Sequence, residues 1–210
     1  MNEPLRIAVD LDGVLYDFEG ACRFLLEENF GLVVPRPSTS WNFIKNYCRD
    51  EGKPEAWGWL WTEGVKQGLF RYGHLLKGAR RAMHALSAQG HSLVTITKRP
   101  RTAREDTLDW LGFYRLPMDE VHVLEDRSKA SVLPQCDLYL DDSLDNVEEL
   151  VTRLPSASVL LWDQPWNQEP VLDWFMPGRC RRVYAWDQVL EEVAAHQDWM
   201  LRRREWKTPA

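Results

Sequence analysis

Two aspartates, Asp10 and Asp12, stand one residue apart where an apolar run of the chain ends. Residues 5–9 are typical of a short buried strand, and in an open α/β sheet ligands bind at the carboxyl ends of the strands. Side chains at alternate positions of an extended chain share a face, so the two carboxylates come close together. Two negative charges at such short range repel each other unless a cation or a proton compensates them. The pair therefore predicts a reactive site.

Further polar residues of matching chemistry occupy the ends of later predicted strands. Thr97 ends one strand, Asp141 and Asp142 end another, and Lys129 lies in the connection before the second. At one sheet edge, these carboxylates, the hydroxyl and the ammonium group would hold a hard cation and a phosphoryl group. Mg²⁺ suits such a site, because it takes few carboxylates and keeps waters and phosphate oxygens as its other ligands.

The elements that must position these residues alternate between strand and helix from residue 79 onward. The expected strands cover residues 91–97, 121–124, 138–140 and 159–162, with a short one near Val183. The expected helices cover residues 79–89, 102–111, 144–154 and 186–203. Alternation of this kind implies a parallel sheet covered on both faces. We therefore expect an α/β fold with a Rossmann-like, three-layer arrangement.

Residues 17–76 depart from this alternation. They are rich in aromatic residues, and their pattern predicts helices, the first over residues 16–30 with Gly31 as its stop. We expect this segment to be a helical insertion, a cap, in one α/β domain formed by residues 1–16 and 77–210. Asp17 and Asp145, although acidic, are interpreted as turn or helix-cap residues.

The composition excludes several classes of protein. The 210 residues carry a formal net charge of −6, which argues against a broad basic surface for nucleic acid. No apolar run is long enough to cross a membrane, and the charged Glu3 and Arg6 are atypical of a signal peptide. The 4 cysteines lack metal-ligand spacing, which favours a reduced, cytoplasmic protein. The sequence leaves the oligomeric state open, a homodimer included.

Four short motifs, taken in chain order, resemble those of the haloacid dehalogenase-like phosphohydrolase superfamily. They are Asp10-Leu11-Asp12-Gly13, Thr97, Lys129 and Asp141-Asp142. The resemblance covers most of the chain. It implies that Asp10 is the nucleophile and forms an aspartyl-phosphate, and that Asp12 is first the general acid and then the general base.

The same resemblance implies a ligand set for Mg²⁺. The Asp10 carboxylate, the Asp12 backbone carbonyl and Asp141 would hold the ion, and Asp142 would order a metal-bound water. Two further residues, Thr97 and Lys129, would contact the transferring phosphoryl oxygens, and the lysine would also offset the charge of the nucleophile.

Three further stretches resemble the 5′(3′)-deoxyribonucleotidases, whose helical cap lies between the first and second motifs. They are residues 12–18, 68–70 and 162–167. In that family the aromatic residue matching Phe18 packs on the nucleobase, and the other candidates here are Trp41, Trp61 and Phe70. The alternative is that these rings fill the core of the cap itself, as aromatic residues at helical spacing often do.

Two basic residues are further candidates for binding the phosphate. Lys98 follows Thr97 where the family often has a serine, so it adds positive charge near the phosphate or points to solvent. Arg127 matches an arginine of some family members that could contact phosphate, and the alternative is a surface residue.

The leading hypothesis is a magnesium-dependent phosphomonoesterase that hydrolyses (deoxy)ribonucleoside monophosphates. A second keeps the fold but changes the substrate to another small phosphoester, such as a sugar phosphate. A third is a phospho-signalling module, although there the acidic residues follow a different order along the chain. A fourth is a binding protein without activity, which the presence of both Asp10 and Asp12 disfavours.

Overall fold

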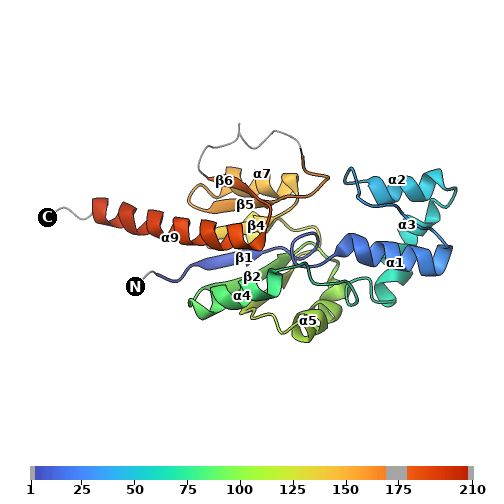
Figure 1. Ribbon diagram of the computed structural model, residues 1–210, viewed down its shortest axis with the longest axis horizontal. Helices are drawn as coiled ribbons and strands as arrows, with labels where there is room; N and C mark the ends of the chain where they lie inside the picture. Colours follow the sequence, from blue (N-terminus) through green and yellow to red (C-terminus); the bar gives the residue numbers. More distant parts are fainter. Residues whose placement is uncertain (1–2, 169–178, 208–210) are drawn as a thin grey trace.

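Six parallel strands form the central sheet in the computed structural model, which describes residues 3–168 and 179–207 (Figure 1). Their order across the sheet is β3-β2-β1-β4-β5-β6. The strands are β1 (Arg6–Val9), β2 (Ser92–Thr97), β3 (Glu120–Val123), β4 (Leu138–Asp141), β5 (Ser158–Trp162) and β6 (Cys180–Val183). The predicted α/β fold with a parallel sheet is confirmed.

Strands β1 and β4 are neighbours at the centre of the sheet, and their register places the acidic residues together. Val9 pairs with Leu140, and the backbone N–H of Asp10 donates to the Leu140 carbonyl at 2.9 Å. Both strands are rich in buried Ile, Val and Leu, as expected of parallel strands that are covered on both faces. Asp10 and Asp141 therefore emerge side by side at one edge of the sheet.

Helices cover both faces of the sheet, which makes the three layers predicted from the alternating pattern. One apolar cluster joins Ile7 and Leu140 to helices α4 (Ala79–Ala88), α5 (Arg104–Phe113) and α9 (Trp186–Lys207). The other joins Ala8 and Tyr139 to α6 (Lys129–Val132) and α7 (Leu144–Arg153). The short helix α6 was not predicted, and it carries Lys129 as its first residue. A 3₁₀ turn, η2 (Arg101–Ala103), precedes α5.

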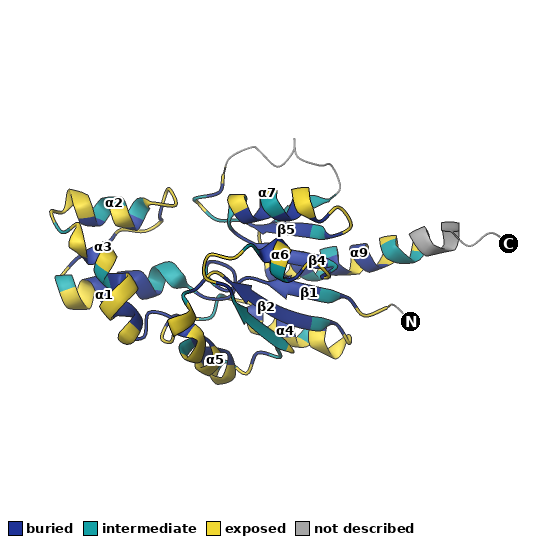
Figure 2. Cartoon of the chain, turned by 180° about the vertical axis from the view of Figure 1, so that it is seen from behind, coloured by how far each residue is buried: buried dark blue, intermediate teal, exposed yellow. Residues whose placement is uncertain are grey.

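The remaining helices lie beyond the carboxyl ends of the strands (Figures 1 and 2). They are α1 (Phe18–Phe30), α2 (Phe43–Asp50), α3 (Glu55–Trp59) and the π-helix η1 (Leu60–Gly64). We call this group the cap helices. The chain enters and leaves them along adjacent segments, because Asp17 N–H donates to the His74 carbonyl and Leu76 N–H to the Leu15 carbonyl. The domain boundaries at residues 16/17 and 76/77 stay a prediction.

Local capping explains where two helices begin. The Asp17 side chain accepts a hydrogen bond from Gly20 N–H at 2.8 Å, so Asp17 is the N-cap of α1, as predicted. The same interpretation of Asp145 was wrong. The N-cap of α7 is Ser143, whose hydroxyl accepts from Asn146 N–H, and Asp145 lies in the first turn, where its charge favours the helix dipole.

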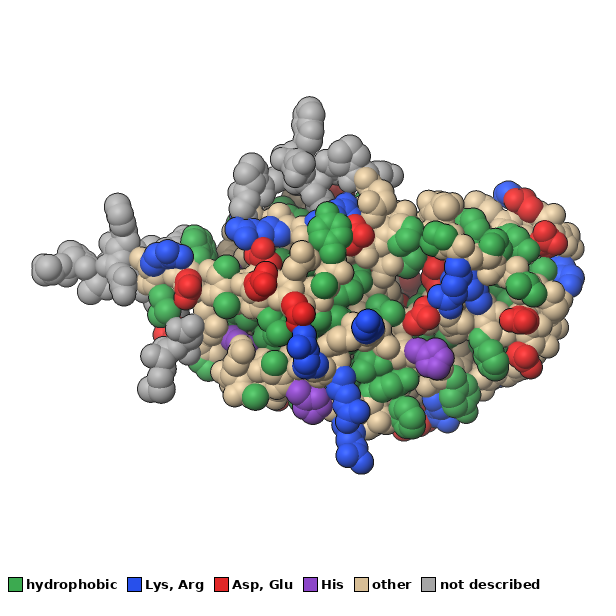
Figure 3. Space-filling view, viewed as in Figure 1, with side chains coloured by type: hydrophobic (Ala, Val, Ile, Leu, Met, Phe, Trp, Pro, Cys, Tyr) green, Lys and Arg blue, Asp and Glu red, His purple; other side chains and the backbone are tan. Residues whose placement is uncertain are grey.

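Two predictions from composition can be compared with the described residues. Cys22, Cys48 and Cys136 are buried, Cys180 is half-buried, and all four are free thiols. None of the described helices has the length and apolar character that crossing a membrane requires. On the face shown in Figure 3, acidic and basic side chains of the described residues are interspersed.

Candidate active site

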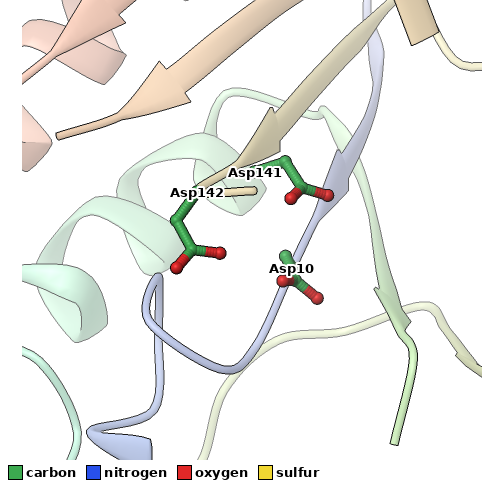
Figure 4. A group of neighbouring side chains, drawn as sticks. All are labelled: Asp10, Asp141 and Asp142. Carbon is green, nitrogen blue, oxygen red and sulfur yellow. The ribbon is translucent and has the colours of Figure 1, made fainter. Parts of the chain in front are cut away.

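Three buried carboxylates meet where β1 and β4 end (Figure 4). Asp10 follows β1, Asp141 is the last residue of β4 and Asp142 comes directly after it. One oxygen from each residue lies within 4.8 Å of the others. The sheet register alone accounts for this meeting, because parallel strands carry the residues at their carboxyl ends to a single edge.

Lys129 is the cation that faces these carboxylates. Its Nζ lies 2.8 Å from Asp10 Oδ1 and 2.6 Å from Asp141 Oδ2, and its side chain is 1% exposed. Both contacts are buried ion pairs, so the lysine ammonium compensates part of the negative charge of the cluster.

Burial dominates the electrostatics of this cluster. It raises the pKa of Asp10 well above that of an ordinary aspartate. The charge of Lys129 lowers this pKa, but the charges of Asp141 and Asp12 raise it further. It also raises the pKa of Asp142, where the charges of Asp10 and Asp141 add to the effect. For Lys129 burial acts to lower the pKa, but the two neighbouring carboxylates outweigh it, so the pKa is raised.

The cluster fits a divalent metal ion. Three carboxylates face one ammonium group, so the site holds excess negative charge that a proton or a cation must compensate. The donors are all oxygen, which hard cations prefer.

Hydrogen bonds from the next helix orient Asp141. Asn146 Nδ2 and Ser143 N–H donate to its Oδ1 at 3.1 and 3.0 Å. Sequence reasoning missed both residues. The sequence does contain a sign of their role, because Ser143 and Asn146 occupy the capping positions of a helix that starts directly after the acidic pair.

A second group orients Asp142. Trp166 Nε1 donates to Asp142 Oδ2 at 3.1 Å, and Asn167 Nδ2 donates to the Asp142 carbonyl at 2.8 Å. Both belong to residues 162–167, which the sequence analysis singled out only as a family resemblance. The ring of Trp166 also meets Trp41 from the cap side, with centroids 6.3 Å apart.

A cavity of about 600 Å³ opens over the carboxylates, and cap helices form part of its wall. This volume is in the range of small-molecule sites. Most of the predicted site residues line it, namely Asp10, Asp12, Phe18, Trp41, Trp61, Phe70, Thr97, Lys98, Lys129 and Asp142. Asp141 lies buried behind this wall, bound to Lys129.

Three of the predicted aromatic residues form one group in the cavity wall. The Phe18 ring centroid lies 5.7 Å from that of Trp61 and 5.9 Å from that of Phe70, whose ring stacks on it. Phe70 is 1% exposed and belongs to the apolar core, so most of its surface serves packing. Trp41 is 64% exposed and lies apart from this group, against Trp166.

The three remaining predicted residues differ in position. Thr97 is buried at the cavity wall, and its Oγ1 accepts from Arg99 N–H at 3.3 Å. Lys98 is exposed and lines the cavity. Arg127 is exposed and is not among the residues that line the cavity, so its position favours the alternative of a surface arginine.

Arg99 is a site residue that the sequence analysis did not assign. Its side chain is fully buried and forms an ion pair with Asp12, with Nη2 2.7 Å from Oδ1. The residues are 87 positions apart, and the only local sign was a run of positive charge after Thr97.

Comparison with known proteins gives a consistent result. The family described as "5' nucleotidase, deoxy (Pyrimidine), cytosolic type C protein" matches residues 3–197. The chain is 22% identical over 204 residues to a protein of Halalkalibacterium halodurans named as a "Putative nucleotidase", covering 96% of this chain and 97% of the relative. It is 28% identical over 161 residues to a "Putative 5'(3')-deoxyribonucleotidase" of Chlorobaculum tepidum, covering 72% and 76%.

Solved structures support the fold. A haloacid dehalogenase-like hydrolase from Streptococcus pneumoniae superimposes with a TM-score of 0.62 at 15% identity, over 90% of this chain and 98% of that chain. A hydrolase of the same superfamily from Deinococcus radiodurans, solved with bound phosphate and sodium, gives 0.59 at 14% identity, over 93% and 97%. The fold suggested by the four motifs is thus confirmed.

Proposed function

The chain belongs to the family of cytosolic type C 5′-nucleotidases, and from this premise we propose that it is a magnesium-dependent hydrolase of (deoxy)ribonucleoside monophosphates. Membership makes it a phosphoric monoester hydrolase, which agrees with the prediction of an enzyme over a signalling module or an inactive binding protein. The metal, the substrate and the covalent intermediate are the proposed part.

One observation carries the proposal. Asp10, Asp142 and Lys129 line a cavity whose wall also carries aromatic rings, and Asp141 completes their buried cluster. The cluster has the charges and donors for a cation and a phosphoryl group, and flat apolar rings suit a nucleobase. A sugar phosphate lacks an aromatic ring for Phe18 and Trp61 to contact, so the cavity favours a nucleotide.

In the proposed reaction, a carboxylate oxygen of Asp10 attacks the phosphorus atom and the ester oxygen leaves. Asp12 protonates this oxygen, so that a nucleoside departs and an aspartyl-phosphate remains. Asp12 then takes a proton from a water that attacks the phosphorus, which releases phosphate and restores Asp10.

Lys129 and Thr97 would bind the phosphoryl oxygens during both steps. The ammonium group of Lys129 also offsets the charge of Asp10, so that a dianionic phosphate can approach a carboxylate. A bound Mg²⁺ supplies further positive charge to the phosphoryl oxygens. The Asp10 carboxylate, the Asp12 backbone carbonyl and Asp141 would hold it, and Asp142 would order a water.

Phosphate release from a panel of esters tests this proposal. The panel contains dUMP, dTMP, AMP and GMP, with ribose 5-phosphate and glucose 6-phosphate as the sugar phosphates. We expect turnover of at least one nucleotide, its loss in EDTA and its recovery with Mg²⁺. The variant Asp10→Asn should fold normally and show no turnover, while Asp50→Asn, an exposed aspartate, should retain it.

Three results would contradict the proposal in separate ways. Release from sugar phosphates alone would favour the second substrate class. Full activity in EDTA would exclude the metal, and wild-type turnover by Asp10→Asn would exclude the covalent route.

The remaining expectations extend the proposal to the cellular setting. We propose a cytoplasmic enzyme whose partner is a small phosphate ester, with neither nucleic acid nor membrane as a partner. The free thiols and the net charge of −6 support this. The oligomeric state, a homodimer included, stays open to measurement by light scattering.

A further inference from the structure

The Arg99 guanidinium binds the carboxylate of Asp12 through two of its nitrogens. Arg99 Nε lies 3.1 and 3.0 Å from Asp12 Oδ1 and Oδ2, and Nη2 lies 2.7 Å from Oδ1. The Asp12 side chain is 25% exposed toward the cavity, whereas that of Arg99 is 0% exposed. A planar guanidinium that meets a carboxylate through two nitrogens restricts its orientation, which a lysine ammonium does not.

Arg99 is itself held rigidly. Its Nη1 donates to the Phe70 carbonyl at 3.3 Å and to Thr107 Oγ1 at 3.0 Å, and Thr107 in turn donates to the Ala103 carbonyl. The rings of Tyr16 and Phe70 flank the guanidinium, with their centroids 4.3 and 4.8 Å from Cζ. Hydrogen bonds in the plane and rings above it leave the group little freedom to move.

Through Arg99, Asp12 is also connected to the two segments that link the sheet to the cap helices. Tyr16 precedes α1, and its hydroxyl donates to the Leu69 carbonyl and accepts from Gly73 N–H. Arg99 thus contacts Tyr16, which precedes the cap helices, and Phe70, which follows them. The orientation of Asp12 therefore depends on how the cap helices pack against the sheet.

We propose that Arg99 is a positioning residue for Asp12. Arg99 fixes the Asp12 carboxylate at the angle and distance that proton transfer to the leaving oxygen requires. This inference rests on the proposed function, in which Asp12 is the acid and base. A group that acts in this way affects the reaction only through Asp12. A buried ion pair that merely stabilises the fold would instead affect all substrates alike.

Leaving groups of different basicity separate these two roles. A nucleoside departs from its monophosphate as an alkoxide that needs a proton, whereas 4-nitrophenolate departs from 4-nitrophenyl phosphate as a stable anion. We expect Arg99→Lys to lower kcat/KM for the nucleotide by about 100-fold, the usual cost of a misplaced catalytic group. For 4-nitrophenyl phosphate we expect a change within about 3-fold, because the acid contributes little there.

A double-mutant cycle adds a second readout. In the Asp12→Asn background, Arg99→Lys should cause no further loss with the nucleotide, because the residue through which Arg99 acts is already disabled. The matched control is Arg101→Lys, which changes an arginine whose side chain is 70% exposed and should leave both substrates unaffected. Equal losses with both esters, or multiplying losses in the double variant, would overturn the inference.

Folding is checked by circular dichroism and thermal unfolding. If Arg99→Lys does not fold, Thr107→Val removes one support of the guanidinium without touching Asp12, and it should show a smaller loss with the same preference for the nucleotide. An unselective loss in Thr107→Val would count against the inference.

A measurement without activity distinguishes failure of this inference from failure of the proposed function. The NMR signal of the Arg99 Nε–H group should be protected from solvent exchange in the wild type and in Asp10→Asn, and should lose that protection in Asp12→Asn. An unprotected wild-type signal would overturn the positioning role. A protected signal in an enzyme that cleaves neither ester would overturn the proposed function instead.

Discussion

Lys129 Nζ lies 2.8 Å from Asp10 Oδ1, with the two side chains 1% and 9% exposed. At that depth water screens neither charge well, so each depends on the other. The lysine therefore compensates the charge of the carboxylate that the proposed reaction uses as its nucleophile.

Removing this lysine should destabilise the protein, and Mg²⁺ should restore part of the loss. Lys129→Met leaves three carboxylates without their cation, which should lower the free energy of unfolding by about 3 kcal/mol in EDTA. Urea denaturation with and without Mg²⁺ measures both effects. The control Lys66→Met removes an exposed ion pair with Glu63 and should change stability by less than about 1 kcal/mol. A Lys129→Met protein as stable as the wild type in EDTA would contradict the compensating role.

Trp166 should tune metal binding through its indole N–H. Trp166→Phe keeps a ring against Trp41 but loses the hydrogen bond to Asp142, so we expect Mg²⁺ affinity to fall by about 10- to 100-fold. Isothermal titration calorimetry measures this. Trp41→Phe is the matched control, because the Trp41 ring faces Trp166 and bonds to no carboxylate among the described residues. The Mg²⁺ affinity of this variant should stay within about 2-fold of the wild type. Equal losses in both variants would point to ring packing instead.

Phe18 should contribute to nucleotide binding but not to the chemical step. Phe18→Ala removes the centre of the group formed with Trp61 and Phe70, and we expect KM for the nucleotide to rise about 10-fold, the worth of one aromatic contact. KM for a small ester without a base should stay unchanged. Phe24→Ala, on the same helix and 58% exposed, is the control. An equal rise for both esters would support the alternative that Phe18 belongs to the core of the cap.

His91 should contribute a part of the stability that is lost in mild acid. Its Nδ1 accepts from Leu5 N–H at 3.0 Å, and burial lowers its pKa below the ordinary value. The unfolded chain therefore binds a proton more readily than the folded protein, so this contribution is complete above about pH 6.5 and is lost as the pH falls below it. His91→Gln keeps an acceptor for Leu5 and should flatten the fall in unfolding free energy between about pH 7 and pH 5. Identical pH profiles would contradict the assignment.

Much of the site follows from local pattern, because a parallel sheet delivers the ends of its strands to one edge. The spacing of apolar and polar residues predicts β1, β2 and β4. With them it places Asp10 beside Asp141, and Thr97 in the same cavity wall as Asp10. The N-cap of α1 at Asp17 is equally local, since its partner is three residues away. Such short-range features can be predicted because the residues that form them are close together in the sequence.

Tertiary structure alone decided the contacts between distant segments. The ion pair of Arg99 with Asp12 and the hydrogen bond of Trp166 to Asp142 join residues 87 and 24 positions apart, so they depend on strand order and on the seating of the cap helices. Arg127 had a chemistry that suits phosphate, yet the packing leaves it at the surface. Periodicity in the sequence specifies which residues are buried and in which element, but a contact between elements also requires their relative placement, which is a property of the whole packed core.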